Sequence, residues 1–214
     1  MREPPRARFL LVVAPHPDDE TIGCGGLIRR TLAQGGRVAV LVVTDGVASH
    51  RHSPSHPPAV LRARRRRETR AAVKALGLRA RDLTMLALPD GGLDTLGGRG
   101  RARLARALAR YAGADVVAMP DPGDAHPDHR NTARAVSPPF RNRRRLTYAV
   151  WPAPGTATPR YALPIAHHRG AKARALSRHR SQLGAITDDP TGFAIDAATR
   201  RRFLARTETF GEIR

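Results

Sequence analysis

Residues 9–26 read FLLVVAPHPDDETIGCGG. The apolar run 9–14 is too short for a helix and too continuous for a half-exposed strand, so it predicts a buried parallel strand. A polar turn, 15–20, follows at once, and a helical pattern begins at Thr21. A buried strand that turns directly into a helix is typical of the first half of a βαβ unit.

The same alternation continues as far as residue 151. Further short apolar runs predict strands at 38–43, 84–88, 116–119 and 146–151. Apolar residues spaced three and four apart predict helices at 21–34, 60–76, 101–111 and 130–136. Strands that alternate with helices predict the α/β class, here a Rossmann-like three-layer sandwich with a mostly parallel sheet.

The pattern weakens after residue 151. We expect an extended piece near 161–167 and helices near 172–182 and 197–206. We predict a single domain, 1–214, in which 1–151 form the Rossmann-like core and 152–214 complete it. The loop 48–58, with three His and three Pro, is expected to be a mobile rim segment.

The chain is strongly basic. Lys and Arg together number 38 against 18 Asp and Glu, which gives a formal net charge of +20, and only two of the basic residues are lysines. Such a surface attracts anions, so a nucleic-acid site is an alternative function. The arginines are spread along the whole chain, however, and aromatic residues, at 4%, leave little for base stacking. We therefore disfavour nucleic acid as a partner.

A membrane-spanning segment and an internal disulfide are also disfavoured. The longest apolar run is far shorter than the roughly 20 residues of a membrane span. Residues 1–5 lack the features of a secretory signal, so we expect a cytoplasmic protein without a membrane partner. Cys24 is the only cysteine, so any metal must be held by His and carboxylate side chains.

Four polar loops follow predicted strands. In open α/β sheets the ligand site lies beyond the carboxyl ends of the strands, so these loops are expected to meet at one edge. They are residues 15–20, 44–46, 89–92 and 120–129. Each could be an ordinary turn, but two of them contain a His-Pro-Asp segment, which indicates a functional site.

His16, Asp19 and His129 are the predicted metal ligands. Two His and one carboxylate leave a coordination position for water, as catalytic zinc sites do. Zinc is the first choice of metal, and iron(II) is an alternative because nitrogen and oxygen ligands do not separate the two. In the competing interpretation, His16 and Asp19 only cap a helix and His129 lies on the surface.

Three further residues are predicted to be catalytic. Asp18 is expected to project away from Asp19 and to act as general base for a metal-activated water. His126, as an imidazolium, is expected to stabilise a tetrahedral oxyanion and protonate the leaving amine, with a fourth metal ligand as the alternative. Asp128 is expected to accept from the far nitrogen of His126, with a helix N-cap as the alternative.

These motifs carry a resemblance to a known family. Pro-His-Pro-Asp-Asp-Glu at 15–20, Gly-Cys-Gly-Gly at 23–26 and His-Pro-Asp-His at 126–129 resemble the PIG-L/LmbE-like zinc-dependent N-acetylglucosaminide deacetylases. Weaker matches at 65–77, 88–92 and 172–182 follow in the same order. The resemblance implies zinc ligands, a base and an assisting histidine at the positions given above: His16, Asp19, His129, Asp18 and His126.

The resemblance also adds Arg65, which it places near the sugar or its phosphate-bearing aglycone. The alternative for Arg65 is a solvated helix charge, because it lies within the run 64–67 of four arginines. We expect Cys24 to be a small packing residue. We expect three other acidic residues to be hydrogen-bond partners of loops: Glu20, Asp45 and Asp90.

The predicted function is a zinc-dependent N-deacetylase. It would remove acetyl, or another short acyl group, from a small-molecule 2-acylamino sugar in a glycoside or sugar conjugate. The alternatives are an amidase that cleaves a cysteine-conjugate amide and a non-catalytic protein that binds anions or nucleic acid. A dinucleotide-binding oxidoreductase is disfavoured because the turn 15–20 lacks the glycine fingerprint.

Overall fold

The computed structural model describes residues 1–213. Its centre is a seven-stranded sheet with the order β3-β2-β1-β4-β5-β7-β6. The strands are β1 Phe9–Ala14, β2 Arg37–Thr44, β3 Leu83–Leu88, β4 Val116–Pro120, β5 Arg144–Tyr148, β6 Tyr161–Pro164 and β7 Thr207–Ile213. The first five strands are parallel, and β7 runs antiparallel to both β5 and β6.

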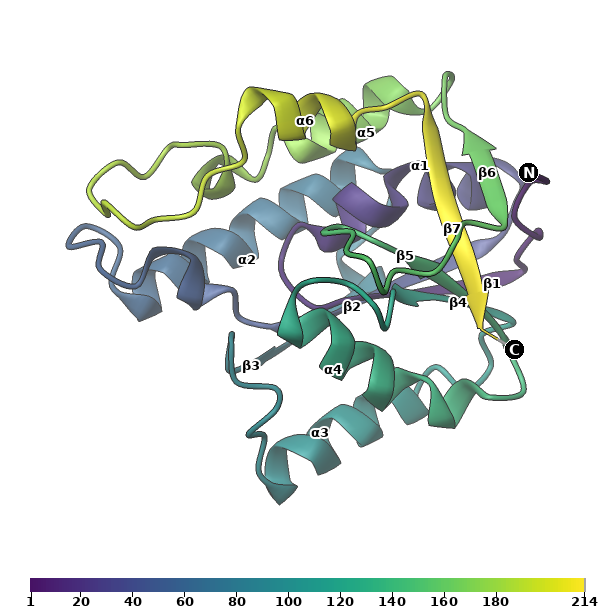
Figure 1. The fold of residues 1–214 in the computed structure, drawn as a ribbon, viewed down its shortest axis with the longest axis horizontal. Helices are drawn as coiled ribbons and strands as arrows, with labels where there is room; N and C mark the ends of the chain where they lie inside the picture. Colours follow the sequence, from purple (N-terminus) through teal and green to yellow (C-terminus); the bar gives the residue numbers. More distant parts are fainter. Residues whose placement is uncertain (214) are drawn as a thin grey trace.

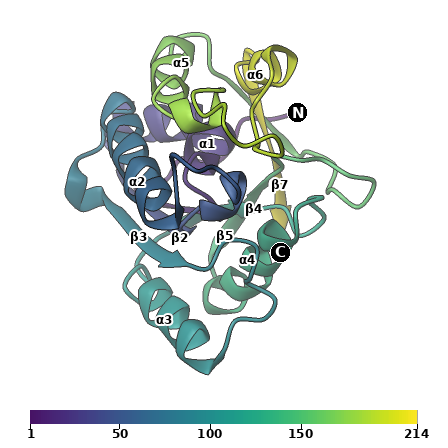
Figure 2. The same ribbon diagram turned by 90° about the vertical axis from the view of Figure 1, so that its left-hand side faces the viewer.

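Six helices cover the two faces of this sheet. They are α1 Asp19–Ala33, α2 Pro58–Ala75, α3 Gly98–Ala109, α4 Pro127–Val136, α5 Arg169–Leu176 and α6 Ala197–Phe203. Helices α1, α2, α5 and α6 lie on one side of the sheet, and α3 and α4 lie on the other (Figures 1 and 2). The predicted Rossmann-like three-layer α/β sandwich with a mostly parallel sheet is confirmed.

Strand β1 shows why the sheet is central. Leu10 and Val12 belong to the hydrophobic cluster under α1, α2 and α5, whereas Leu11 and Val13 belong to the cluster under α3 and α4. All four side chains are fully buried. Because successive side chains of a strand point to opposite faces, a continuous apolar run fits only a strand covered on both sides.

The structure differs from the sequence-based expectations mainly after β4. The fifth strand ends at Tyr148 rather than 151, so Val150 and Trp151 belong to the loop beyond it. Strand β7 was not predicted, and it inserts between β5 and β6. The predicted helix 172–182 ends at Leu176 and is followed by a short 3-10 turn. The single-domain organisation stays a prediction.

Glu208 on β7 attaches the C-terminal part of the chain to α1. Its carboxylate accepts from the backbone N–H groups of Gly26 and Leu27 at 2.7 and 2.9 Å. A Cβ atom at Gly26 would lie 2.2 Å from the side chain of Ile165 and 3.0 Å from Glu208. The approach therefore requires a glycine, which gives one physical reason for the Gly-Cys-Gly-Gly segment.

Within residues 1–213, no helix has the length and apolar character needed to cross a membrane.

Candidate metal and active site

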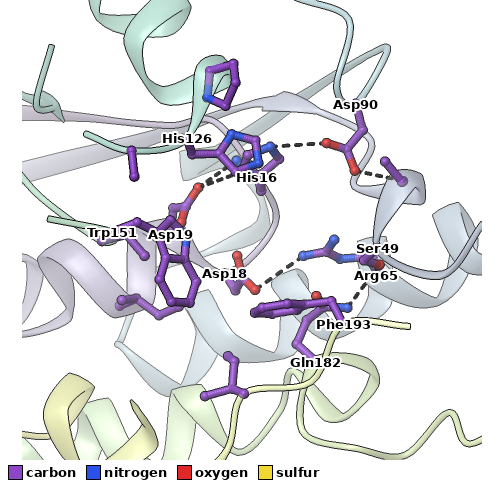
Figure 3. A pocket seen from close by; sticks show the side chains of 16 residues that line it. His16, Asp18, Asp19, Ser49, Arg65, Asp90, His126, Trp151, Gln182 and Phe193 are labelled. Atoms are coloured by element: carbon purple, nitrogen blue, oxygen red, sulfur yellow. Dashed lines mark hydrogen bonds and ion pairs between the residues drawn. The ribbon is translucent and has the colours of Figure 1, made fainter. Parts of the chain in front are cut away.

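A cavity of about 560 Å³ opens at the carboxyl edge of the parallel strands. This volume falls within the range of about 300–1,000 Å³ that is usual for small-molecule sites. One part of its wall is polar and is formed by His16, Asp18, Asp19, Ser49, Arg65, Asp90, His126 and Gln182 (Figure 3). The remaining lining is almost entirely apolar: Ile22, Ala48, Ala125, Pro127, Val150, Trp151, Phe193 and Ile195.

The three predicted metal ligands meet at one point beside this cavity. Oδ2 of Asp19 lies 3.2 Å from Nδ1 of His16 and 3.2 Å from Nε2 of His129, and the two ring nitrogens are 3.3 Å apart. Zinc ligands about 2.0–2.1 Å from a tetrahedral ion lie roughly 3.3 Å from one another. The spacing of these three atoms therefore fits a zinc-sized ion.

The far nitrogen of each ligand histidine faces a carboxylate. Nε2 of His16 lies 3.1 Å from Asp90 and 3.3 Å from Asp128, and Nδ1 of His129 lies 3.3 Å from Asp124. Such partners fix the tautomer of a metal-binding histidine and raise its basicity, so they are the usual companions of a metal site. Both rings are therefore held with a nitrogen directed at the shared point near Asp19.

The electrostatics of the site favour a cation. Burial by itself would lower the pKa of His129, but Asp19 and Asp124 outweigh it and raise the pKa to about 9. The pKa of His16 is likewise raised against the effect of burial, through Asp128, Asp19 and Asp90. Burial would raise the pKa of Asp19, yet the two histidines lower it. The carboxylates of Asp19, Asp90, Asp124 and Asp128 thus surround two histidines, and this arrangement suits a bound cation.

The donors near His16 allow other groupings. His126 offers a ring nitrogen close to those of His16 and His129, and Asp90 and Asp128 form a second group with His16. Asp90 and Asp128 already accept backbone N–H groups, from Ala48 and Gly91 respectively, both at 2.8 Å. Both carboxylates lie at Nε2 of His16, whereas Asp19 and His129 lie at its Nδ1, so Asp90 and Asp128 are placed to orient this ring.

Asp18 occupies a strained position between strand and helix. Its φ angle is 145°, in a region that residues other than glycine rarely adopt, and its carbonyl accepts from Thr21 and Ile22 at the start of α1. Such strain costs of order 1–3 kcal/mol and is typical of functional sites. Burial raises the pKa of Asp18 to about 7, against the effect of Arg65. The turn thus separates Asp18 from Asp19 and directs Asp18 into the cavity, where a base could act.

Arg65 is buried behind Asp18. Its guanidinium donates to the carbonyls of Gly46 and Pro17, both at 2.7 Å, and lies 3.3 Å from Oδ2 of Asp18. The interpretation of Arg65 as a solvated helix charge is wrong, because only 3% of the residue is exposed. Gly46 has a φ of 71°, and a Cβ atom there would lie 2.4 Å from Arg65. The loop is therefore shaped around this guanidinium.

His126 and Asp128 bond differently from the expectation. Nδ1 of His126 accepts from the backbone N–H of Asp128 at 3.2 Å, so a neutral ring carries its proton on Nε2. The expected bond from the ring of His126 to the Asp128 carboxylate is wrong, because that carboxylate turns toward His16 and Gly91. The helix N-cap of α4 is His126 itself, not Asp128. Burial, followed by His16 and His129, lowers the pKa of His126, which favours a neutral ring over the expected imidazolium.

The loop 48–58 lies at the rim as expected, but hydrogen bonds anchor it. The hydroxyl of Ser53 donates to Asp188 at 2.6 Å, and the backbone N–H of His52 donates to Asp189 at 2.9 Å. The N–H of Phe193 donates to the carbonyl of Ser49 at 2.8 Å. The rim of the cavity is thus built from two chain segments that hold each other in place.

The loop partners and Cys24 lie as expected. Glu20 accepts from the backbone of Asp18 at 3.1 Å, Asp45 accepts from Arg62, and Asp90 accepts from Ala48. Cys24 is fully buried, and burial raises the pKa of its thiol.

The role of Asp124 was not anticipated. It lies in the turn Asp-Pro-Gly-Asp at 121–124, where a carboxylate is indistinguishable from an ordinary turn former. A signal was nevertheless present, since Asp124 precedes His129 by five residues within the same loop. The contact of buried His179 with Glu20, at 3.4 Å, was also not anticipated.

Comparisons with known proteins place both His-Pro-Asp motifs within one family profile. A family profile described as PIG-L, GlcNAc-PI de-N-acetylase, matches residues 11–138, the segment that carries both His-Pro-Asp motifs. The chain belongs to the PIG-L family. The resemblance expected from those motifs is therefore confirmed.

Individual PIG-L relatives cover most of the chain. It is 31% identical over 199 residues to the diacetylchitobiose deacetylase of Thermococcus kodakarensis, covering 81% of this chain and 69% of that protein. It is 30% identical to a probable N-acetyl-α-D-glucosaminyl L-malate deacetylase of Bacillus cereus, with coverages of 85% and 87%. The solved N,N′-diacetylchitobiose deacetylase of Pyrococcus horikoshii shares the fold, with a TM-score of 0.75, 23% identity, and coverages of 97% and 84%.

Proposed function

We propose that this protein is a metal-dependent N-deacetylase of 2-acetamido sugars in glycosides or sugar conjugates. The convergence of His16, Asp19 and His129 within 3.2–3.3 Å, beside a cavity that Asp18 and His126 line, carries the proposal. The two relatives that are at least 30% identical are named as deacetylases of acetylated glucosamine compounds, which supports the same chemistry.

His16, Asp19 and His129 would hold the ion, with zinc as our first choice and iron(II) as the alternative. A bound divalent ion of this kind supplies Lewis acidity, which lowers the pKa of water and polarises a carbonyl oxygen. Asp90, Asp128 and Asp124 keep the two ligand histidines in the orientation that binding requires. The role of Asp128 is therefore to position His16.

Asp18 would act as the general base. Its carboxylate lies in the cavity, where Arg65 contacts one of its oxygens, and takes a proton from the attacking water. The same carboxyl, once protonated, is placed to return that proton toward the leaving amine. Three N–H groups of Arg65 point at Asp18 and two backbone carbonyls, so we assign it to holding the base in position.

His126 would assist the same reaction through its second ring nitrogen. Its Nδ1 is engaged by the N–H of Asp128, so the Nε2–H remains to donate a hydrogen bond to the oxygen of the amide as negative charge develops there. This assignment uses the neutral ring that the lowered pKa favours. A donor that is already in place costs no reorganisation during the reaction.

The test combines metal analysis with amine release. Elemental analysis of the purified chain should give close to one metal ion per chain after incubation with zinc, and His129→Ala should lose it. N,N′-diacetylchitobiose and N-acetylglucosaminyl malate are the first substrates to assay for a free amine. Asp18→Asn should keep the metal and lose turnover by about 10²–10⁴-fold.

Two results would contradict the proposal. One is near-native activity of Asp18→Asn, and the other is failure of the metal-loaded chain to release amine from any acetamido sugar.

A further inference from the structure

Two aromatic rings form a corner in the wall of the cavity. The rings of Trp151 and Phe193 have centroids 5.9 Å apart and are perpendicular, with an interplanar angle of 90°. Both lie on the side of the cavity away from Asp90 (Figure 3). Only nine of the 214 residues are aromatic, so the gathering of two of them at one cavity is a specific feature of the site.

The position of Trp151 is fixed relative to the metal ligands. Oδ2 of Asp124, which lies 3.3 Å from His129, also accepts from the backbone N–H groups of Val150 and Trp151 at 2.9 and 3.0 Å. Behind the indole, Phe203 packs edge to face with a centroid distance of 5.7 Å. One carboxylate therefore sets the distance between the reacting centre and the aromatic wall.

Phe193 is fixed by its backbone while its ring stays accessible. Its N–H donates to the carbonyl of Ser49, which joins it to the anchored rim. The residue is 37% exposed and is one of only three large hydrophobic residues that are exposed within residues 1–213. An aromatic ring held open to solvent at the mouth of a cavity is suited to contact a ligand.

Ile22, Val150 and Ile195 continue this apolar wall. The buried end of the cavity, at His16 and Asp19, must receive the acyl group, because the reaction takes place there. The part of the substrate that does not react then extends toward the open end, where the aromatic corner lies. Aromatic rings prefer edge-to-face or offset contacts at 4.5–7 Å, so a perpendicular pair can receive a third ring with one face and one edge in contact.

We propose that the preferred substrate is an acetamido sugar whose aglycone is apolar and carries an aromatic ring, which packs into the corner against both Trp151 and Phe193. This inference rests on the proposed deacetylase function and names the class of substrate. It predicts that phenyl N-acetylglucosaminide binds more tightly than methyl N-acetylglucosaminide. The expected gain is about 3- to 10-fold, the usual worth of an aromatic contact.

Trp151 is the only tryptophan, so its fluorescence reports binding at this wall without any turnover. The zinc-loaded Asp18→Asn chain would be titrated with the phenyl and the methyl glycoside in both anomeric forms. Adding Phe193→Ala should remove the preference for phenyl, and adding Phe193→Tyr should retain it. Val60→Ala, which truncates another exposed apolar residue outside the cavity, should change neither affinity.

Equal affinities for the two glycosides would overturn the inference, and so would a phenyl preference that survives Phe193→Ala. An equal loss of affinity for both glycosides in Phe193→Ala would also overturn it, because the ring would then support the structure of the rim without contacting the aglycone. Amine release by the wild-type chain is measured separately. Its absence with both glycosides, with N,N′-diacetylchitobiose and with N-acetylglucosaminyl malate would contradict the proposed function, while the titration still decides where the aglycone binds.

Discussion

Lys172 and Glu208 form a buried ion pair that binds one backbone carbonyl and one backbone N–H of helix α1. Nζ of Lys172 donates to the carbonyl of Ile22, and Glu208 accepts from the N–H of Gly26, four residues later; Lys172 and Glu208 are themselves 2.7 Å apart. In a regular helix this carbonyl and this N–H would bond to each other. The pair thus fastens α5 and β7 to the first turns of α1, directly after Asp19.

We expect Lys172→Met to lower the free energy of unfolding by about 3–5 kcal/mol, because Glu208 would keep a buried and unpaired charge. The double variant Lys172→Met/Glu208→Gln should lose less than the sum of the two single variants. Denaturant unfolding measures all three. Lys74→Met changes the only other lysine, which is exposed, and should stay within about 0.5 kcal/mol of the wild type. Strict additivity would contradict a direct coupling.

The contact between Asp124 and His129 predicts an effect on metal affinity. Asp124→Asn should weaken zinc binding by about 10–100-fold, since the ring of His129 loses the partner that orients it. Competition with a chelator of known affinity measures the change. Asp121→Asn is the matched control, because Asp121 is buried in the same loop and bonds Gly123 and Thr147 but no histidine. Equal effects of the two variants would mean that loop structure alone is responsible.

Arg65→Lys separates positioning of the base from contact with substrate. A lysine keeps the charge but cannot reproduce the three contacts to Gly46, Pro17 and Asp18, so we expect kcat to fall by about 10–100-fold. KM should change little, and zinc content should not change. Arg66→Lys, on the exposed side of the same helix, is the control. A rise in KM with unchanged kcat would instead assign Arg65 to substrate binding.

His179 predicts a pH dependence of stability. Burial would lower its pKa, but the contact with Glu20 outweighs burial and raises it. A raised pKa in the folded state stabilises the protein fully below the unfolded value of about 6.5, and this contribution is lost as pH rises through the folded pKa. In zinc-saturated protein, His179→Gln should therefore flatten the fall in Tm above pH 6.5. His167→Gln, at an exposed position, should leave the slope unchanged, and a slope unaffected by His179→Gln would contradict the assignment.

The parallel half of the fold was predictable because each strand there is a continuous apolar run covered on both faces. Strand β7 was not, because residues 207–213 mix Thr, Glu and Gly with Phe and Ile, and only pairing with β5 and β6 makes them a strand. Its location depends on contacts between distant segments rather than on local propensity.

The convergence of His16, Asp19 and His129 was predictable from one rule, that polar residues after parallel strands meet at one edge. The burial of Arg65 was left open by its run of arginines, although Leu61 and Thr69, four residues away on either side, are buried on the same face of α2. Which carboxylate serves which histidine depends on loop conformation, so the partners of His16 and His129 could not be assigned from spacing.

His16 and His129 are separated by 113 residues, and they meet only because β1 and β4 pair in the folded sheet. The unfolded chain offers no equivalent site, so an ion bound there contributes RT ln(1 + [L]/Kd) to the stability of the native state. The melting temperature of the protein should therefore depend on the concentration of free metal. A chelator would lower the thermal stability of the whole chain as well as its activity, which makes heat resistance a measure of metal supply.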